Sequence, residues 1–147
     1  MKITSYIILL TLILFITSCN KVSNSPKGCV TSFIVAVEQH DMSKAWSLLG
    51  KDAQAYYNDL GEKQRRSGKG ALENEIGRIK TFRNASKDFS IRKDKDNNDN
   101  VKLVVLGTQE FIIETVNEEE SYKIKNAQSV KNILNVIASE VEKQVPY

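Results

Sequence analysis

Histidine and cysteine are scarce in this sequence. Its 147 residues include one histidine and two cysteines. A zinc site needs several histidine, cysteine or carboxylate ligands, so this composition gives poor support for a metal centre. Catalysis by an activated nucleophile needs a base within reach, and His40 is the only histidine that could serve as that base. His40 follows a predicted helix, where the dipole favours a cationic ring, and we expect it to cap that helix or to be solvated.

A complete phosphate-binding loop is also absent. The segment Gly68-Lys69-Gly70 contains the glycine-lysine pair of that motif. The motif needs an earlier glycine where Lys63 stands, and a serine or threonine where Gly70 stands. We therefore exclude phosphate binding by this motif.

The acidic and amide-rich run at residues 94–100 imitates a calcium loop but lacks two of its required residues. Asp99 takes the place of the loop's glycine, and Val105 takes the place of its final glutamate. Aspartate and asparagine favour turns, because their side chains bond to nearby backbone groups. The run therefore predicts a hairpin turn.

The sequence also lacks an apolar run long enough to span a membrane with ease. Its longest run lies at the N-terminus, where residues 3–16 comprise 14 residues, whereas a spanning helix needs about 20. The run follows Lys2 and ends in small residues, which is the layout of a secretory signal peptide. We expect residues 1–18 to be that signal.

The segment Ile16-Thr17-Ser18-Cys19 resembles the lipobox of bacterial lipoproteins. The resemblance implies cleavage before Cys19, lipidation of that cysteine, and a tether over residues 19–25. Extended residues 20–25 reach about 20 Å, so the folded part would stay close to the membrane. In some bacteria, aspartate after the lipidated cysteine resembles a signal that retains the protein in the inner membrane. Asn20 stands at that position here, which favours the outer membrane, facing the periplasm. The alternatives are an uncleaved membrane helix, or a secreted protein in which Cys19 is incidental.

Removal of residues 1–18 leaves 129 residues, which is one ordinary domain. With Cys19 assigned to lipid, Cys29 is unpaired, and we expect it in the core because unpaired cysteine is usually buried. A reactive thiol, or a disulfide between chains, is the alternative.

Charge is distributed unevenly along the chain. Residues 63–95 carry a net charge of +7, and residues 96–120 a net charge of −6. Folding is expected to mix these charges into a neutral surface. If they segregate instead, the basic end could meet anionic lipid or polysaccharide.

Four helices are predicted before residue 84, from capping residues and from apolar residues at helical spacing. The predicted starts are Ser25-Pro26, Asp41 and Asp52, and the predicted ends are Gly50 and Gly61. Residues 62–70 are expected to form a charged loop. The fourth helix is predicted to carry Leu72, Ile76, Ile79 and either Phe82 or Arg83 on one side.

Alternation and β-branched residues then predict four antiparallel strands at residues 89–92, 101–106, 111–116 and 122–125. A last helix, capped by Ser129, is predicted to bear Val130, Ile133, Leu134, Ile137 and Val141 on one stripe. The fold class is therefore α+β, with N-terminal helices on a curved antiparallel sheet and an extra C-terminal amphipathic helix, in a single domain over residues 26–147. The central strands are apolar on both faces, so we expect the C-terminal helix to cover the back of the sheet.

Residues 33–49, an apolar helix, an acidic turn and an Ala45-x-x-Leu48 helix, resemble the nuclear transport factor 2-like superfamily. Tyr122-Lys123-Ile124 resembles its closing strand. The resemblance covers about residues 30–126 and implies a cystatin-like cone of helices on a curved sheet. Some members, such as ketosteroid isomerase, use an aspartate and a tyrosine inside the cone. Tyr56, Tyr57 and Asp59 are present here, but no motif places them in a pocket.

We expect a membrane-anchored bacterial lipoprotein that acts as a non-catalytic binding or scaffolding module. The alternative is a small-molecule-binding protein or weak enzyme that uses the interior of the cone. The candidate binding residues are Tyr56, Tyr57, Arg65 and Arg66, and no catalytic residue, cofactor or metal is expected. The expected partners are the membrane, through Cys19, and a protein or second copy, through the back of the sheet or the C-terminal helix. Nucleic acid is not expected.

Overall fold

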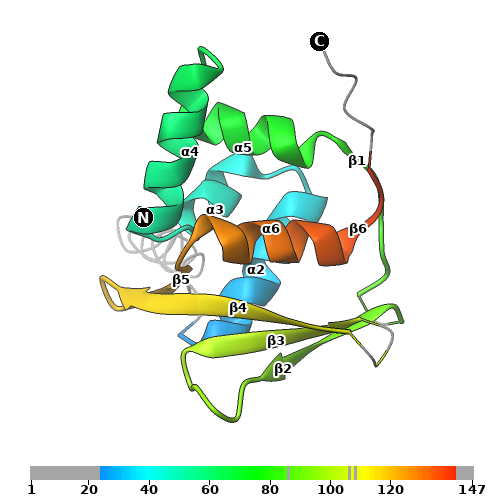
Figure 1. Ribbon diagram of the computed structural model, residues 1–147. Coiled ribbons are helices and arrows are strands. Elements are labelled where there is room, and N and C mark those ends of the chain that lie inside the picture. The colour runs from blue at the N-terminus through cyan, green and yellow to red at the C-terminus, as the bar shows by residue number, and fades with distance from the viewer. Residues whose placement is uncertain (1–23, 86, 106, 108, 142–147) are drawn as a thin grey trace, which may run out of the picture.

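The computed structural model describes residues 24–141, apart from residues 86, 106 and 108, and shows an α+β fold (Figure 1). The predicted signal and Cys19 lie outside the described residues. The helices are α2 (Pro26–Glu38), α3 (Met42–Ser47), α4 (Lys51–Lys63), α5 (Gly68–Ile76) and α6 (Ala127–Ile137). The strands are β1 (Ile79–Phe82), β2 (Phe89–Lys93), β3 (Asn100–Val105), β4 (Gln109–Glu118), β5 (Ser121–Ile124) and β6 (Ala138–Val141).

The main sheet is a curved antiparallel meander in the order β2-β3-β4-β5, which confirms the four predicted strands. Its register places Leu103 of β3 between Ile91 of β2 and Phe111 of β4. These three side chains therefore share one face of the sheet, since side chains directly opposite one another point the same way. That face carries the core.

Two of the predicted helix starts are confirmed by their caps. The Ser25 hydroxyl accepts a hydrogen bond from the Gly28 amide at 3.1 Å, with proline in the first turn. The Asp41 carboxylate accepts one from the Lys44 amide at 2.9 Å. Each cap satisfies an amide that the helix itself leaves unpaired.

The third start was predicted wrongly, because its cap comes from far along the chain. Gly50 does not end α3 but is the N-cap of α4, and Asp52 only lies in the first turn. The Lys51 amide donates to Glu118 of β4 at 3.2 Å. A carboxylate near a helix N-terminus is stabilised by the dipole, so the end of the β4–β5 hairpin is joined to the start of α4.

The end of α4 was also predicted wrongly. Gly61 lies inside the helix, and the following turn closes when the Arg66 amide donates to the Gly61 carbonyl at 2.9 Å. Arg65 adopts a left-handed conformation, with φ of 54°, at a position that usually holds glycine. A Cβ at Gly61 would lie 2.7 Å from the Arg66 carbonyl oxygen, so glycine lets the turn pass this close.

The fourth predicted helix is shorter than expected. It ends at Ile76, and Ile79 and Phe82 instead lie in β1, which pairs with β6 as a separate two-stranded sheet. Val141 likewise belongs to β6 rather than to the helical stripe, and half of its surface is exposed. The two strands are about sixty residues apart in the chain, so local periodicity could not reveal their pairing.

The core lies between the helices and the concave face of the sheet. Helix α2 crosses the sheet and contacts β2, β3, β4 and β5. The buried members of the core include Phe33, Val37, Leu48, Leu49, Leu72, Ile76, Phe89 and Leu103. Ile79, Ile91, Phe111 and Tyr122 are partly buried and pack against them.

Helix α6 lies on the same side of the sheet as α2, so the prediction that it covers the back is wrong (Figure 1). Val130, Ile133 and Ile137 belong to the core cluster with α2, whereas Ile112 on the opposite face is 50% exposed. The physical reason is that α2 alone leaves part of the concave face of β3 and β4 uncovered. The apolar stripe of α6 is buried there instead.

The back of the sheet is partly polar. Lys102 of β3 forms ion pairs with Asp94 at 3.5 Å and with Glu110 at 3.7 Å. Val104, on the same face as Lys102, is buried but is not part of the core cluster. Because charged side chains lie among the apolar ones, the back of the sheet can be exposed to solvent.

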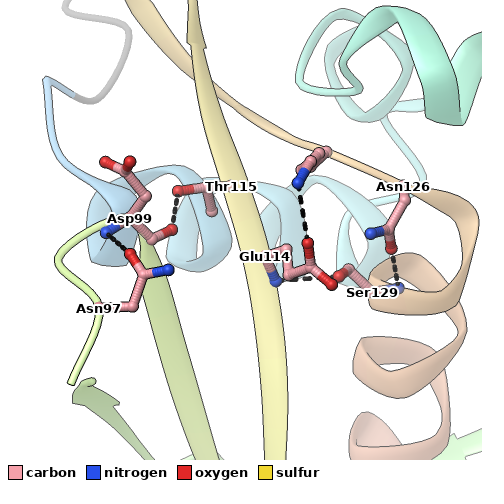
Figure 2. A network of polar contacts seen from close by, with 7 residues as sticks. Asn97, Asp99, Glu114, Thr115, Asn126 and Ser129 are labelled. Atoms are coloured by element: carbon pink, nitrogen blue, oxygen red, sulfur yellow. Dashed lines mark hydrogen bonds and ion pairs between the residues drawn. The ribbon is translucent and has the colours of Figure 1, made fainter. Parts of the chain in front are cut away.

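Helix α6 also closes an open edge of β4, which β5 leaves unpaired because it pairs only with residues 115–118. The Glu114 backbone amide donates to the Ser129 hydroxyl at 2.9 Å, and the side-chain amide of Asn132 donates to the Ile112 carbonyl at 3.2 Å. Figure 2 shows Ser129 beside β4, with Asn126 capping the helix. Asn126, rather than the predicted Ser129, is thus the N-cap, and Ser129 serves the sheet.

Ser129→Ala should lower the free energy of unfolding by about 1–3 kcal/mol, because it leaves the Glu114 amide without its partner in a part-buried place. Asn135→Ala, on an exposed position of the same helix, should be near neutral. Urea unfolding of both variants measures the difference. Equal midpoints for the two variants would show that the bond to β4 contributes nothing.

Candidate functional site

The four candidate binding residues come from α4 and the turn after it, but the structure does not gather them into one site. Tyr56 and Tyr57 lie in the middle of the helix, whereas Arg65 and Arg66 lie beyond its C-terminus. A helix rises about 1.5 Å per residue, so Tyr57 lies about 9 Å along the axis from the last helical residue, Lys63, after which the arginines follow. The two pairs therefore do not form one site.

Tyr57 is fully buried between α4 and α5. Its hydroxyl donates a hydrogen bond to Glu75 of α5 at 2.7 Å. Burial, followed by the negative charge of Glu75, raises the pKa of Tyr57 far above its usual range. The phenol therefore stays protonated and joins two helices, which is a structural role and not that of a base.

Tyr56 is exposed over 38% of its surface but is also engaged. The Lys131 ammonium group of α6 donates to its hydroxyl at 2.7 Å and lies 4.5 Å from the centre of its ring. The ring stands edge-on to Tyr57, with centroids 5.2 Å apart. This cation–aromatic contact ties α4 to α6 at the surface.

Arg65 and Arg66 are exposed on the turn between α4 and α5. Neither takes part in an ion pair among the residues that the structure describes. Their guanidinium groups are thus available to an anion from outside the molecule, since a guanidinium presents several donors in a fixed plane.

The space between the helices and the sheet is occupied by apolar side chains. Its largest fully buried members include Phe33, Leu48, Leu103, Ile113 and Ile133, and Trp46 packs partly buried against them. The buried polar side chains in the described part of the chain are Asp94, Thr115 and Ser129. The Thr115 hydroxyl donates to the Asp99 carbonyl (Figure 2). The Asp94 carboxylate accepts from the Asp96 amide at 3.1 Å, so these groups serve turns and strands.

Cys29 lies in the core, as expected. Its side chain is fully buried, and burial raises the pKa of the thiol to about 12, although the positive charge of Lys123 opposes the shift. A thiol with so high a pKa stays protonated at neutral pH and is a poor nucleophile.

His40 is exposed after α2, with its ring edge-on to Phe82 at 6.5 Å between centroids. Its backbone is left-handed, with φ of 56°, and its amide donates to the Val37 carbonyl at 3.1 Å. It therefore belongs to the turn that ends the helix, where it was expected.

The run at residues 94–100 forms the hairpin turn that was predicted. The Asn97 side chain accepts from the Asp99 amide at 2.9 Å, as Asp94 does from Asp96, so these side chains hold the turn itself. Within the described residues, no group of three or more histidine, cysteine or acidic side chains is placed to hold a metal ion.

A shallow cleft between α2 and α3 was not predicted from the sequence. It has a volume of about 330 Å³ and is lined by Thr31, Ser32, Val35, Ala36, Gln39, Asp41 and Lys44. Val35, with 41% of its surface exposed, is an apolar residue on the outer side of α2 and was the available signal. The Asp41 carboxylate that borders the cleft already caps α3.

Comparison with protein-family models, with curated proteins and with solved structures finds no match to this chain. Among residues 24–141, apart from the three that are not described, no helix is long and apolar enough to cross a membrane.

Tyr57→Phe should show how the buried phenol affects stability at high pH. An unfolded tyrosine ionises near pH 10.0, whereas the buried one stays protonated, so this group's contribution is complete below pH 10.0 and declines above it. The variant loses the bond to Glu75, about 1 kcal/mol at neutral pH, but also loses this pH dependence.

The difference in unfolding free energy between wild type and Tyr57→Phe should therefore narrow between pH 8 and about pH 11. Tyr56→Phe, which removes an exposed phenol from the same helix, is the control. A difference that stays constant with pH would contradict the assignment of Tyr57 as a protonated, buried donor.

Proposed function

We propose that this chain is a bacterial lipoprotein, anchored to a membrane through lipid on Cys19, whose folded domain is a non-catalytic binding or scaffolding module. The observation that carries the proposal is the segment Ile16-Thr17-Ser18-Cys19 at the end of a short apolar run after Lys2. Such a run is too short to span a membrane comfortably and has the layout of a signal peptide. A cysteine at the cleavage point supplies the thiol to which lipid is attached.

The start of the folded domain supports this proposal. Helix α2 begins at Pro26, which leaves residues 20–25 as a short link of up to about 20 Å from Cys19. Stable anchoring needs two or more acyl chains, and the resemblance to bacterial lipoproteins implies that lipidation of Cys19 provides them. We place the protein at the outer membrane, facing the periplasm, because Asn20 and not aspartate follows the cysteine.

The non-catalytic role is supported by the filled interior. In the nuclear transport factor 2-like architecture, which we propose for residues 30–126, active members use a pocket inside the cone. Here the corresponding space holds side chains from α2 and α6, such as Phe33 and Ile133, and the buried side chains of Asp94 and Ser129 serve a turn and a strand. A small-molecule site in the cone would need these side chains to move, so we favour binding by the outer surface.

Cys19→Ala should release the protein from the membrane fraction, because it removes the thiol that carries the lipid. Mass spectrometry of the wild-type N-terminal peptide should show an acylated Cys19. Cys29→Ala keeps the anchor and is the matched control, so it should stay with the membrane. Retention of Cys19→Ala at the wild-type level would overturn the proposal.

A further inference from the structure

The junction of α4 and α5, from the last residue of α4 to the first turn of α5, carries a group of exposed cations that the fold does not neutralise. We call it the basic corner, and it consists of Lys63, Arg65, Arg66 and Lys69. None of these side chains takes part in an ion pair among the described residues. Within the part of the chain that the structure describes, Lys69 alone of the four side chains has a polar contact, a long one of 3.4 Å to the Ser43 hydroxyl.

The charge of the basic corner is concentrated in a short stretch of the sequence. Residues 62–70 contain the four cations and one acidic residue, Glu62, for a net charge of +3. Four like charges at one exposed junction repel one another, and an anionic partner would remove that repulsion. Two of the four are arginines, whose planar donors fit the two oxygens of a carboxylate or phosphate.

The basic corner is rigidly built. The Arg66 amide donates to Gly61 at 2.9 Å, and the Ser67 hydroxyl accepts from the Gly70 amide at 3.0 Å. A Cβ at Gly68 would lie 2.9 Å from the Asn58 amide nitrogen, so the start of α5 is pressed against α4. A fixed turn loses little backbone freedom when it binds.

The basic corner lies at the far end of the molecule from the sheet and from the start of α2 (Figure 1). Helix α4 has 13 residues and begins beside Glu118 of the sheet, so its other end is about 20 Å away. Charges are screened over about 8 Å at physiological salt. If the chain is anchored just before α2, the bilayer that holds it is not the natural partner of this corner.

We propose that the basic corner binds an anionic polysaccharide presented to the protein from the side away from its anchoring membrane. The choice of a polymer over lipid headgroups rests on the anchoring proposed above. A polymer with one negative charge per sugar can meet several of these cations at once, whereas a small anion meets one or two. Binding at the corner gives the domain a role without using its filled interior.

Full-length protein in a neutral detergent should bind immobilised polygalacturonate but not neutral dextran, and binding should weaken as salt is raised. Arg65→Gln, Arg66→Gln and Lys69→Gln together should weaken it by about tenfold or more. The matched control is Arg92→Gln, Lys93→Gln and Lys95→Gln, which removes the same charge from the exposed end of β2. The control should bind within about twofold of the wild type.

An equal loss in the two triple variants would overturn the proposal, because net charge alone would then explain binding. Binding of phosphatidylglycerol vesicles through the corner, without polygalacturonate binding, would overturn the choice of polymer in favour of lipid. The state of Cys19 is read separately by mass spectrometry. Corner-dependent binding by a protein without lipid would support the site and contradict only the anchor.

Arg65→Gly separates binding from folding. Glycine adopts the left-handed conformation of this position at lower cost, so the variant should unfold at a higher denaturant concentration. It also removes one cation, so it should bind polygalacturonate several-fold more weakly. Higher stability with unchanged binding would contradict the role of Arg65 in the corner.

Discussion

The insertion of α6 against the concave face of the sheet is the interaction on which the rest of this structure depends. Its apolar side completes the core over β3 and β4, and its polar residues Ser129 and Asn132 bond to the edge of β4. An unpaired strand edge tends to pair with other chains. One helix thus covers the exposed apolar face of the sheet and also pairs with the edge of β4 that the short strand β5 leaves open.

The same insertion determines where binding can occur. Because α6 and α2 together fill the concave side, the polar and charged side chains that can contact a partner lie on the outer surface of the domain. Tyr56 and Tyr57, two of the candidate binding residues, instead connect α4 to α6 and α5. The basic corner at the other end of α4 keeps its charges exposed, and this contrast within one helix supports our proposal of a module that binds through its outer surface.

Features that depend on neighbouring residues were predictable from the sequence. Ser25 and Asp41 cap helices through bonds three residues away, and alternation in the outer strands, with β-branched and apolar runs in the central ones, located all four strands of the main sheet. Features that depend on distant residues were not. Glu118 caps α4 from 67 residues away, and β6, the partner of β1, comes after α6 in the chain. At the site, exposure of Arg65 and Arg66 was predictable from charge, but burial of Tyr57 against Glu75 required the packing of two helices.

Native-state hydrogen exchange of the α6 amides tests most directly whether this helix permanently fills the interior. If it does, the amides of residues 131–137 and the Glu114 amide that bonds to Ser129 exchange only as slowly as global unfolding allows. They should then match the slowest amides of β3. Fast exchange in α6 while β3 stays protected would show that the helix opens from the sheet. The interior would then be accessible to a ligand, and the account of a surface-binding domain would be contradicted.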